Sequence, residues 1–184
     1  MAVDFEGFER LQKRLKRLEK ESGDICEAVV REIGGRFLSL VIYETPLGQR
    51  PEGLSPAAAK LWEGYVGGTL KRGWIARTGK EAENGTGEPS AAEINSYKKS
   101  VAVAKNGKTY TLTLMNTVKY APYVEYGHRQ NKGAYIPRLG KRLVTGWAPG
   151  RFFLRRTVTK LRPALPAIIE KKFNTEIKKR FNNG

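Results

Sequence analysis

Residues 101–114 have the sequence VAVAKNGKTYTLTL, which carries the clearest structural signal in this chain of 184 residues. Apolar and polar side chains alternate on both sides of the Asn106-Gly107 pair. Alternation with a period of two is typical of a strand with one buried face. Asn-Gly between two such runs favours a type I′ turn, because both central residues of that turn take a positive φ. The segment therefore predicts an antiparallel β-hairpin that anchors a sheet.

Two amphipathic helices are expected upstream of this hairpin. In residues 5–18 the apolar side chains recur at steps of three and four, as in a helix that buries one face. We expect Gly23 to interrupt this helix and Asp24, with a glutamate three positions later, to cap a second one. Thr45-Pro46 should end the second helix, because the residue before a proline is pushed out of the helical region.

The segments between these helices and the hairpin are less regular. Residues 46–68 are rich in proline and glycine, and we interpret them as a functional arm, since long loops without secondary structure generally bind something. Residues 69–78, TLKRGWIART, have the β-branched and aromatic content of a strand. The polar residues 79–89 are expected to be mobile.

Downstream of the hairpin the sequence predicts a short helix, a second arm and a long helix. Residues 120–126, YAPYVEY, indicate one or two helical turns stopped by a glycine. Residues 129–150 are polar and basic and contain no acidic residue. From residue 151 onward the apolar side chains again step by three or four, and Pro163 and Pro166 require a position near the helix start or at a kink.

These elements predict a single α+β domain in which an antiparallel sheet of about four strands is flanked by N-terminal and C-terminal helices, with two long protruding arms. A chain of 184 residues and 20.6 kDa fits one domain. The expected parts are the N-terminal helices 1–45, the first arm 46–68, the sheet core and short helix 69–128, the second basic arm 129–150 and the C-terminal helix 151–184.

The formal charge of +16 is concentrated in the second half of the chain. Residues 96–184 hold 20 Lys and Arg against three Glu, whereas residues 1–95 are nearly neutral. A solvated basic face is the ordinary explanation of such a bias. At this density, a polyanion or an acidic partner is favoured, because crowded like charges repel unless something screens them, and DNA is the obvious candidate.

The sequence offers no recognisable catalytic constellation. It contains neither a GxxxxGK[ST] motif nor GxGxxG after a strand, and Cys26 lies in a helical pattern where a small buried apolar residue is expected. Glu125 and His128 are three positions apart, but no Asp, Cys or second His follows residue 95 to complete a metal site. We therefore expect no enzymatic activity, no cofactor and no metal. No apolar run approaches the roughly 20 residues of a bilayer span, so we expect no membrane contact.

The second arm is compatible with two functions. Its basic side chains with interleaved aromatics are suited to gripping single-stranded nucleic acid through stacking and phosphate contacts. The same arm is suited to extending over a neighbouring subunit, since Trp, Tyr and Arg are enriched at interface centres. The residue pattern alone leaves both open.

A family resemblance favours the second function. Asn116–Arg129, NTVKYAPYVEYGHR, followed by Gly146–Leu154, GWAPGRFFL, resembles the signature of the tail-completion and neck family of long-tailed phages and phage-derived tail particles, often labelled gene-product-ten-like. The similarity extends to residues 5–20, FEGFERLQKRLKRLEK, to TPLG at residues 45–48 and to GTLKRGW at residues 68–74. Together these pieces cover most of the chain in the right order.

The resemblance implies a structural virion protein at the head-tail junction, assembled in the bacterial host cytoplasm, without enzymatic activity and similar in fold to tail-terminator proteins. Relatives form a ring, most often hexameric. The implied partners are its own copies, the head connector or stopper protein above, the tail terminator or tail tube protein below, and duplex DNA in the lumen. Two alternatives stay open: a free DNA-binding protein without sequence specificity, and the collar or cap of a DNA-free phage-tail-like bacteriocin.

Two sets of residues are expected to serve this function. The expected subunit-interface or arm anchors are Trp62, Tyr65, Trp74, Tyr120, Tyr123, Glu125, His128, Tyr135, Trp147, Phe152 and Phe153. The residues expected to face DNA or the lumen are Arg129, Lys132, Arg138, Lys141, Arg142 and Arg151. Gly127 and Gly150 are expected to permit the turns at the root of the second arm.

Overall fold

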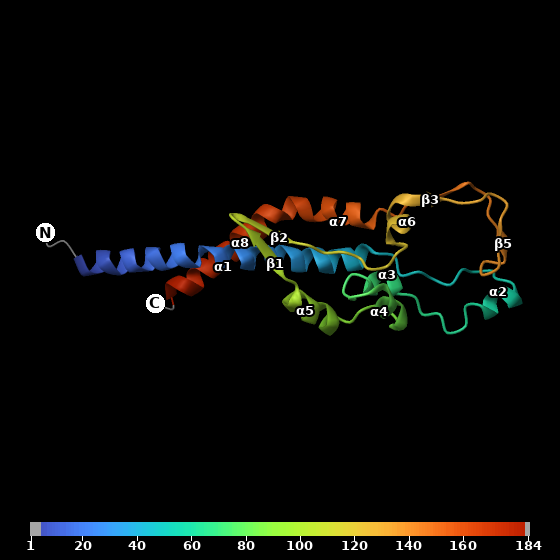
Figure 1. Cartoon of the computed structure of the whole chain (residues 1–184), viewed down its shortest axis with the longest axis horizontal. Helices are drawn as coiled ribbons and strands as arrows, with labels where there is room; N and C mark the ends of the chain where they lie inside the picture. Colours follow the sequence, from blue (N-terminus) through green and yellow to red (C-terminus); the bar gives the residue numbers. More distant parts are fainter. Residues whose placement is uncertain (1–4, 183–184) are drawn as a thin grey trace.

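The computed structural model describes residues 5–182, and it confirms the α+β class. Helices dominate, and the strands are short (Figure 1). The helices are α1 (Phe5–Glu44), α2 (Pro56–Lys60), α3 (Thr69–Arg72), α4 (Gly79–Asn84), α5 (Ala91–Ser100), α6 (Ala121–Tyr126), α7 (Phe153–Leu161), the 3-10 helix η1 (Arg162–Ala164) and α8 (Leu165–Asn182). The strands are β1 (Val103–Asn106), β2 (Thr109–Leu112), β3 (Gly127–Arg129), β4 (Tyr135–Ile136), β5 (Lys141–Arg142) and β6 (Trp147–Pro149).

Helix α1 is one continuous element of 40 residues, and its N-terminal end projects beyond the other elements (Figure 1). The predicted break at Gly23 and the predicted cap at Asp24 were therefore wrong. A glycine inside a helix costs only about 1 kcal/mol, and packing overrides that cost. The hairpin crosses α1 here, and a Cβ on Gly23 would lie 3.0 Å from the Tyr110 hydroxyl. Of the predicted apolar stripe, the side chains of Phe5, Phe8 and Leu11 lie outside those that the structure describes.

The C-terminal helices α7 and α8 pack along α1, and η1 joins them at the predicted proline bend. Two ion-pair groups fix them there. Glu44 at the end of α1 binds Arg156 at 3.0 Å and Lys160 at 2.5 Å. Arg180 of α8 binds Glu21 of α1 at 2.9 Å. The acidic side chains of α1 thus hold both basic C-terminal helices.

Within residues 5–182 the strands form three separate two-stranded antiparallel ladders, β1 with β2, β3 with β6 and β4 with β5, so the predicted single sheet of about four strands was wrong. The predicted hairpin is confirmed, with Asn106 opposite Thr109. Its turn lies one residue later than expected. The central residues of the turn are Gly107 and Lys108. Gly107 has a φ of 58°, whereas Lys108 has no positive φ, since Phe152 is the only non-glycine residue of the described chain that has one. A glycine at the first central position fits a type II′ turn instead of the expected type I′.

The predicted strand at residues 69–78 was wrong, because this segment begins with α3 and continues as a turn. Its apolar side chains do not alternate, and Leu70 and Trp74 lie one helical turn apart and are both buried. The indole Nε1 of Trp74 donates to Thr45 Oγ1 at 2.9 Å. These residues belong to the core, which consists of Leu38, Val41, Ile42, Leu70, Trp74, Ala76, Ala82, Val118, Ala121 and Phe153.

The polar segment after α3 is more ordered than the sequence indicated. Residues 79–84 form α4, and a second helix, α5, follows it without having been predicted. Ser90 and Glu93 cap α5 reciprocally as a capping box. Arg72, buried at 9% exposure, donates to the carbonyls of Ala82, Gly67 and Gly87 and so ties this segment to the start of α3.

Candidate assembly surface

The two arms, residues 46–68 and 129–150, extend from the same end of the helical body and meet at their far ends (Figure 1). We call these two segments together the distal lobe. The Trp62 indole Nε1 donates to the Arg138 carbonyl at 2.6 Å. The Arg138 guanidinium lies 4.5 Å from the Trp62 ring centroid and 5.4 Å from that of Tyr65, and the two rings meet edge to face at 4.7 Å. We call Trp62, Tyr65 and Arg138 the clasp.

The second arm is a twisted ribbon built from two of the short ladders. At its root, Arg129 of β3 pairs with Trp147 of β6, and the Gln130 amide donates to the Gly146 carbonyl at 3.1 Å. Farther out, β4 pairs with β5. Backbone hydrogen bonds therefore give this arm a defined shape, although its sequence shows no strand alternation.

The root of the second arm is fixed by Glu125, which is 4% exposed. Its carboxylate accepts from the amides of Leu154 at 2.9 Å and Arg155 at 3.1 Å. Helix α7 has no side-chain cap of its own, since its N-cap residue Phe152 is in the left-handed region with a φ of 51°. Glu125 thus caps α7 from 29 positions away in the sequence and joins α6 to α7 across the base of the lobe.

Two glycines allow this close approach of α6, β3 and β6. Gly127 has a φ of 84°, a conformation that L side chains rarely adopt. A Cβ on Gly150 would overlap the Glu125 carbonyl oxygen and the Tyr126 backbone. The root of the second arm is therefore a tight crossing that only small residues permit.

The expected anchor residues fall into two groups. Trp74 and Phe153 are 4% and 2% exposed and contact each other edge to face in the core, where a partner cannot reach them. His128 is exposed beside Tyr123, with ring centroids 5.7 Å apart, whereas Glu125 faces the backbone of α7. The aromatic anchors with more than a third of their surface exposed are Tyr65, Tyr120, Tyr123, Tyr135, Trp147 and Phe152.

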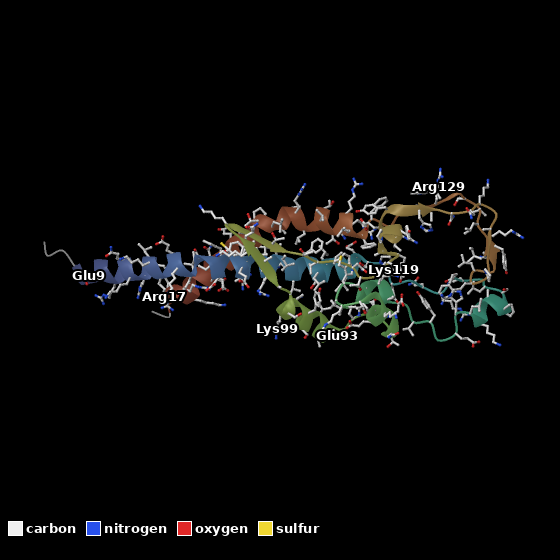
Figure 2. All side chains as sticks on the ribbon, in the orientation of Figure 1. Glu9, Arg17, Glu93, Lys99, Lys119 and Arg129 are labelled. Atoms are coloured by element: carbon white, nitrogen blue, oxygen red, sulfur yellow. The ribbon has the colours of Figure 1, made fainter. Side chains whose placement is uncertain are left out.

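The six basic residues expected to face DNA or the lumen are all exposed, and Figure 2 labels Arg129 at the outer side of the lobe. Two of the six already have partners within the chain. Arg138 belongs to the clasp, and Arg142 stacks over Tyr135 and donates to the Gly133 carbonyl at 2.8 Å. Lys132 and Lys141 project from the ribbon with Arg129, and Arg151 lies at its base.

Sequence reasoning missed three charged residues that hold the surrounding body together. Arg72 is buried, and burial lowers the pKa of its guanidinium. Hydrogen bonds from Lys160 first, and then from Arg156, lower the pKa of Glu44. Hydrogen bonds from Arg180 and Lys172 lower the pKa of Glu176 to about 2. Only the i,i+4 spacing of Lys172, Glu176 and Arg180 was visible in the sequence.

A comparison with family models identifies the relatives of this chain. Residues 9–127 match the model described as "Bacteriophage HK97-gp10, putative tail-component". The chain belongs to this family. The match covers about two thirds of the chain, which establishes an HK97-gp10-like phage tail component, a structural protein of the virion, and confirms the family resemblance seen in the sequence.

The family match ends at Gly127, at the root of the second arm. It includes the first arm of this HK97-gp10-like protein but not the ribbon, α7 or α8. No curated protein and no solved structure matches the chain. Within residues 5–182, no helix combines the length and apolar character of a membrane span, and no three His, Cys, Asp or Glu side chains gather as metal ligands.

Proposed function

We propose that this HK97-gp10-like protein is a non-enzymatic structural component of the phage neck. Its copies form a closed, hexameric ring that completes the tail and joins it to the head connector, and duplex DNA passes through the lumen. The observation that carries this proposal is the distal lobe, which projects from the helical body and exposes aromatic side chains of both arms.

The shape of the chain suits contacts between unlike surfaces of neighbouring copies. A projection on one copy that docks on the body of the next is a heterologous contact, and such contacts close into rings when the rotation between copies permits. Tyr135 and Trp147 of the lobe are 53% and 52% exposed. Half-exposed aromatic residues of this kind are typical interface anchors.

The distribution of charge supports an acidic partner such as DNA or an acidic virion protein. Of the 20 basic residues in 96–184, five form ion pairs with carboxylates of the described chain, namely Arg156, Lys160, Lys172, Lys179 and Arg180. All five are on α7 or α8. The basic side chains of the lobe have no carboxylate partner among the described residues, so their charge is available to another molecule.

Replacing residues 131–145 by Asn-Gly tests the proposal. Gln130 and Gly146 are hydrogen-bonded neighbours, so a two-residue turn connects them and keeps the ladder of β3 and β6. We expect a folded monomer with unchanged helical circular dichroism that forms no ring with tail partners, as measured by native mass spectrometry and electron microscopy. Unchanged assembly of this variant contradicts the proposal.

A second candidate is a free DNA-binding protein without sequence specificity, which the unpaired basic residues of the lobe favour. It predicts tight binding of duplex DNA by the monomer and a steep loss of affinity with salt, because bound phosphates release counterions. Ring formation with tail partners, at salt concentrations where DNA binding is lost, would exclude it. A ring that forms on tails of particles without DNA would instead select the collar or cap of a phage-tail-like bacteriocin.

A further inference from the structure

We propose that the two arms act in assembly as one preformed lobe, and that Arg138 is the positioning residue that keeps this lobe closed. The inference rests on the proposed ring function and adds how the contact surface is presented. It also changes the expected role of Arg138, from a residue that faces DNA to one that binds the first arm.

The contacts of the clasp cross 76 positions of sequence and involve both backbone and side chain. The Arg138 guanidinium lies close to the rings of both Trp62 and Tyr65, and the Trp62 indole in turn donates to the Arg138 carbonyl. The Arg138 side chain is thus held against aromatic rings of the first arm, and these contacts need no phosphate.

A second contact brings the same two arms together. Ser55 caps α2 in the first arm, and Gly140 of the second arm lies against it. A Cβ on Gly140 would be 4.0 Å from the Ser55 Cβ and 3.2 Å from the Ala58 Cβ. Ala58 is 2% exposed although it lies in a five-residue helix far from the core, because the second arm covers it.

A closed lobe is advantageous for assembly because its shape exists before the partner arrives. A protein whose binding-competent state is only partly populated binds more weakly by that fraction. If the arms were independent, each docking event would have to order two flexible segments. With the clasp formed, the exposed aromatic residues of both arms are presented together on one rigid surface.

The test is a reversible covalent lock. Ser55→Cys with Gly140→Cys places two Cβ atoms about 4 Å apart, within the range of a disulfide. Gly140 has a φ of 63° and Ser55 caps α2, so the two substitutions themselves strain the lobe, and the reduced double-cysteine protein is the reference for every comparison. All variants carry Cys26→Ser, which removes the single native cysteine. Each is studied as the full chain, oxidised and reduced, with and without Arg138→Ala, and ring formation is measured by native mass spectrometry.

We expect the locked lobe to assemble as well as the reduced protein. Arg138→Ala in the reduced state should weaken association about five-fold, the effect of losing the stacking on the two rings. Locking should restore it, and Arg138→Lys should lie between, because a lysine keeps the charge without the planar face. Lys108→Ala in the hairpin turn removes the same charge outside the lobe and serves as the matched control.

Two results overturn the inference. If Arg138→Ala stays defective when locked, Arg138 contacts the partner directly. If the oxidised lock blocks assembly that reduction restores, the arms must separate in the ring. Where no variant assembles, the ring proposal fails, and the clasp is tested separately by the rate at which the lock forms in the monomer, which Arg138→Ala should slow. An unchanged rate refutes the clasp.

Discussion

Replacing Glu125 tests the tightest connection between the helical body and the root of the lobe. Its buried carboxylate is the acceptor for two amides in the first turn of α7, at 2.9 and 3.1 Å. Glu125→Ala removes both bonds and leaves the two amides without a partner beside a cavity. Glu125→Gln keeps one acceptor oxygen but turns an NH₂ group toward an amide donor.

The expected loss follows from the number and kind of bonds. Hydrogen bonds to a charged group contribute about 1.5–3 kcal/mol each, and the loss of a helix N-cap costs about 0.5–2 kcal/mol. Because the two amides share one carboxylate, we expect Glu125→Ala to lower the free energy of unfolding by about 2–4 kcal/mol in total. Glu125→Gln should cost about half as much, since one of the two bonds survives.

Urea unfolding followed by circular dichroism measures the free energy, and thermal melts give a second reading. In a chain of this size each kcal/mol lowers Tm by about 2–4 °C, so Glu125→Ala should lower it by about 5–15 °C. Glu170→Ala, an exposed glutamate on α8, is the matched control and should change stability by less than about 0.5 kcal/mol. A Glu125→Ala variant as stable as this control would refute the capping role.

Three further substitutions probe other parts of the body. Arg72→Ala leaves three carbonyls without their donor, so it should lower the free energy of unfolding by about 2–4 kcal/mol and make residues 79–89 sensitive to proteases. Arg77→Ala, at an exposed arginine, is the control and should change neither stability nor proteolysis. Glu176 has a pKa of about 2, below its ordinary value of 4.5, and its ionised form therefore stabilises the fold by at most about 3 kcal/mol above pH 4.5. This stabilisation is lost as the pH falls from 4.5 toward 2. Glu176→Gln should therefore make the free energy of unfolding depend less on pH between 4.5 and 2. Gly150→Ala should destabilise by more than about 1 kcal/mol in urea melts, because its Cβ overlaps backbone. Gly146→Ala should not, because its Cβ would make only an ordinary contact, 3.9 Å from the Gln130 carbonyl oxygen.

The features predicted correctly are those set by local sequence. The hairpin depends on alternation and a glycine turn, and α6 ends at Gly127 because a positive φ stops the helix there. The bend between α7 and α8 depends on two prolines that cannot continue a regular helix. Each signal lies within a few residues of the structure that it specifies.

Two of the errors share a physical cause, which is that tertiary packing overrode a local preference. Gly23 sits in an unbroken helix because the hairpin needs space at that point. Residues 69–78 have the β-branched and aromatic content of a strand, yet they begin with α3, because a helical turn brings Leu70 and Trp74 into the core together. Helix α5 was missed although Ser90 and Glu93 have the spacing of a capping box.

The candidate surface was predictable in composition but not in arrangement. Both arms differ from the rest of the sequence in their content of proline, glycine and charged residues. The periodicity of the two arms does not predict the contact between Trp62 and Arg138. This contact depends on where the helical body places the start of each arm. Glu125 was expected at the root of the second arm, but its partner, the start of α7, could not be read from the sequence.

The acidic residues of this chain explain why the lobe keeps its charge. Helix α1 supplies Glu21 and Glu44, and both are used to hold α7 and α8 against the body. The second arm, residues 129–150, contains no acid, and the first arm adds only Glu52 and Glu63 to the lobe. Copies of such a lobe repel one another, so apolar contact alone must overcome that repulsion unless a partner supplies negative charge. We therefore expect the ring that we propose to be most stable where an acidic surface neutralises the lobes, and duplex DNA would supply such a surface.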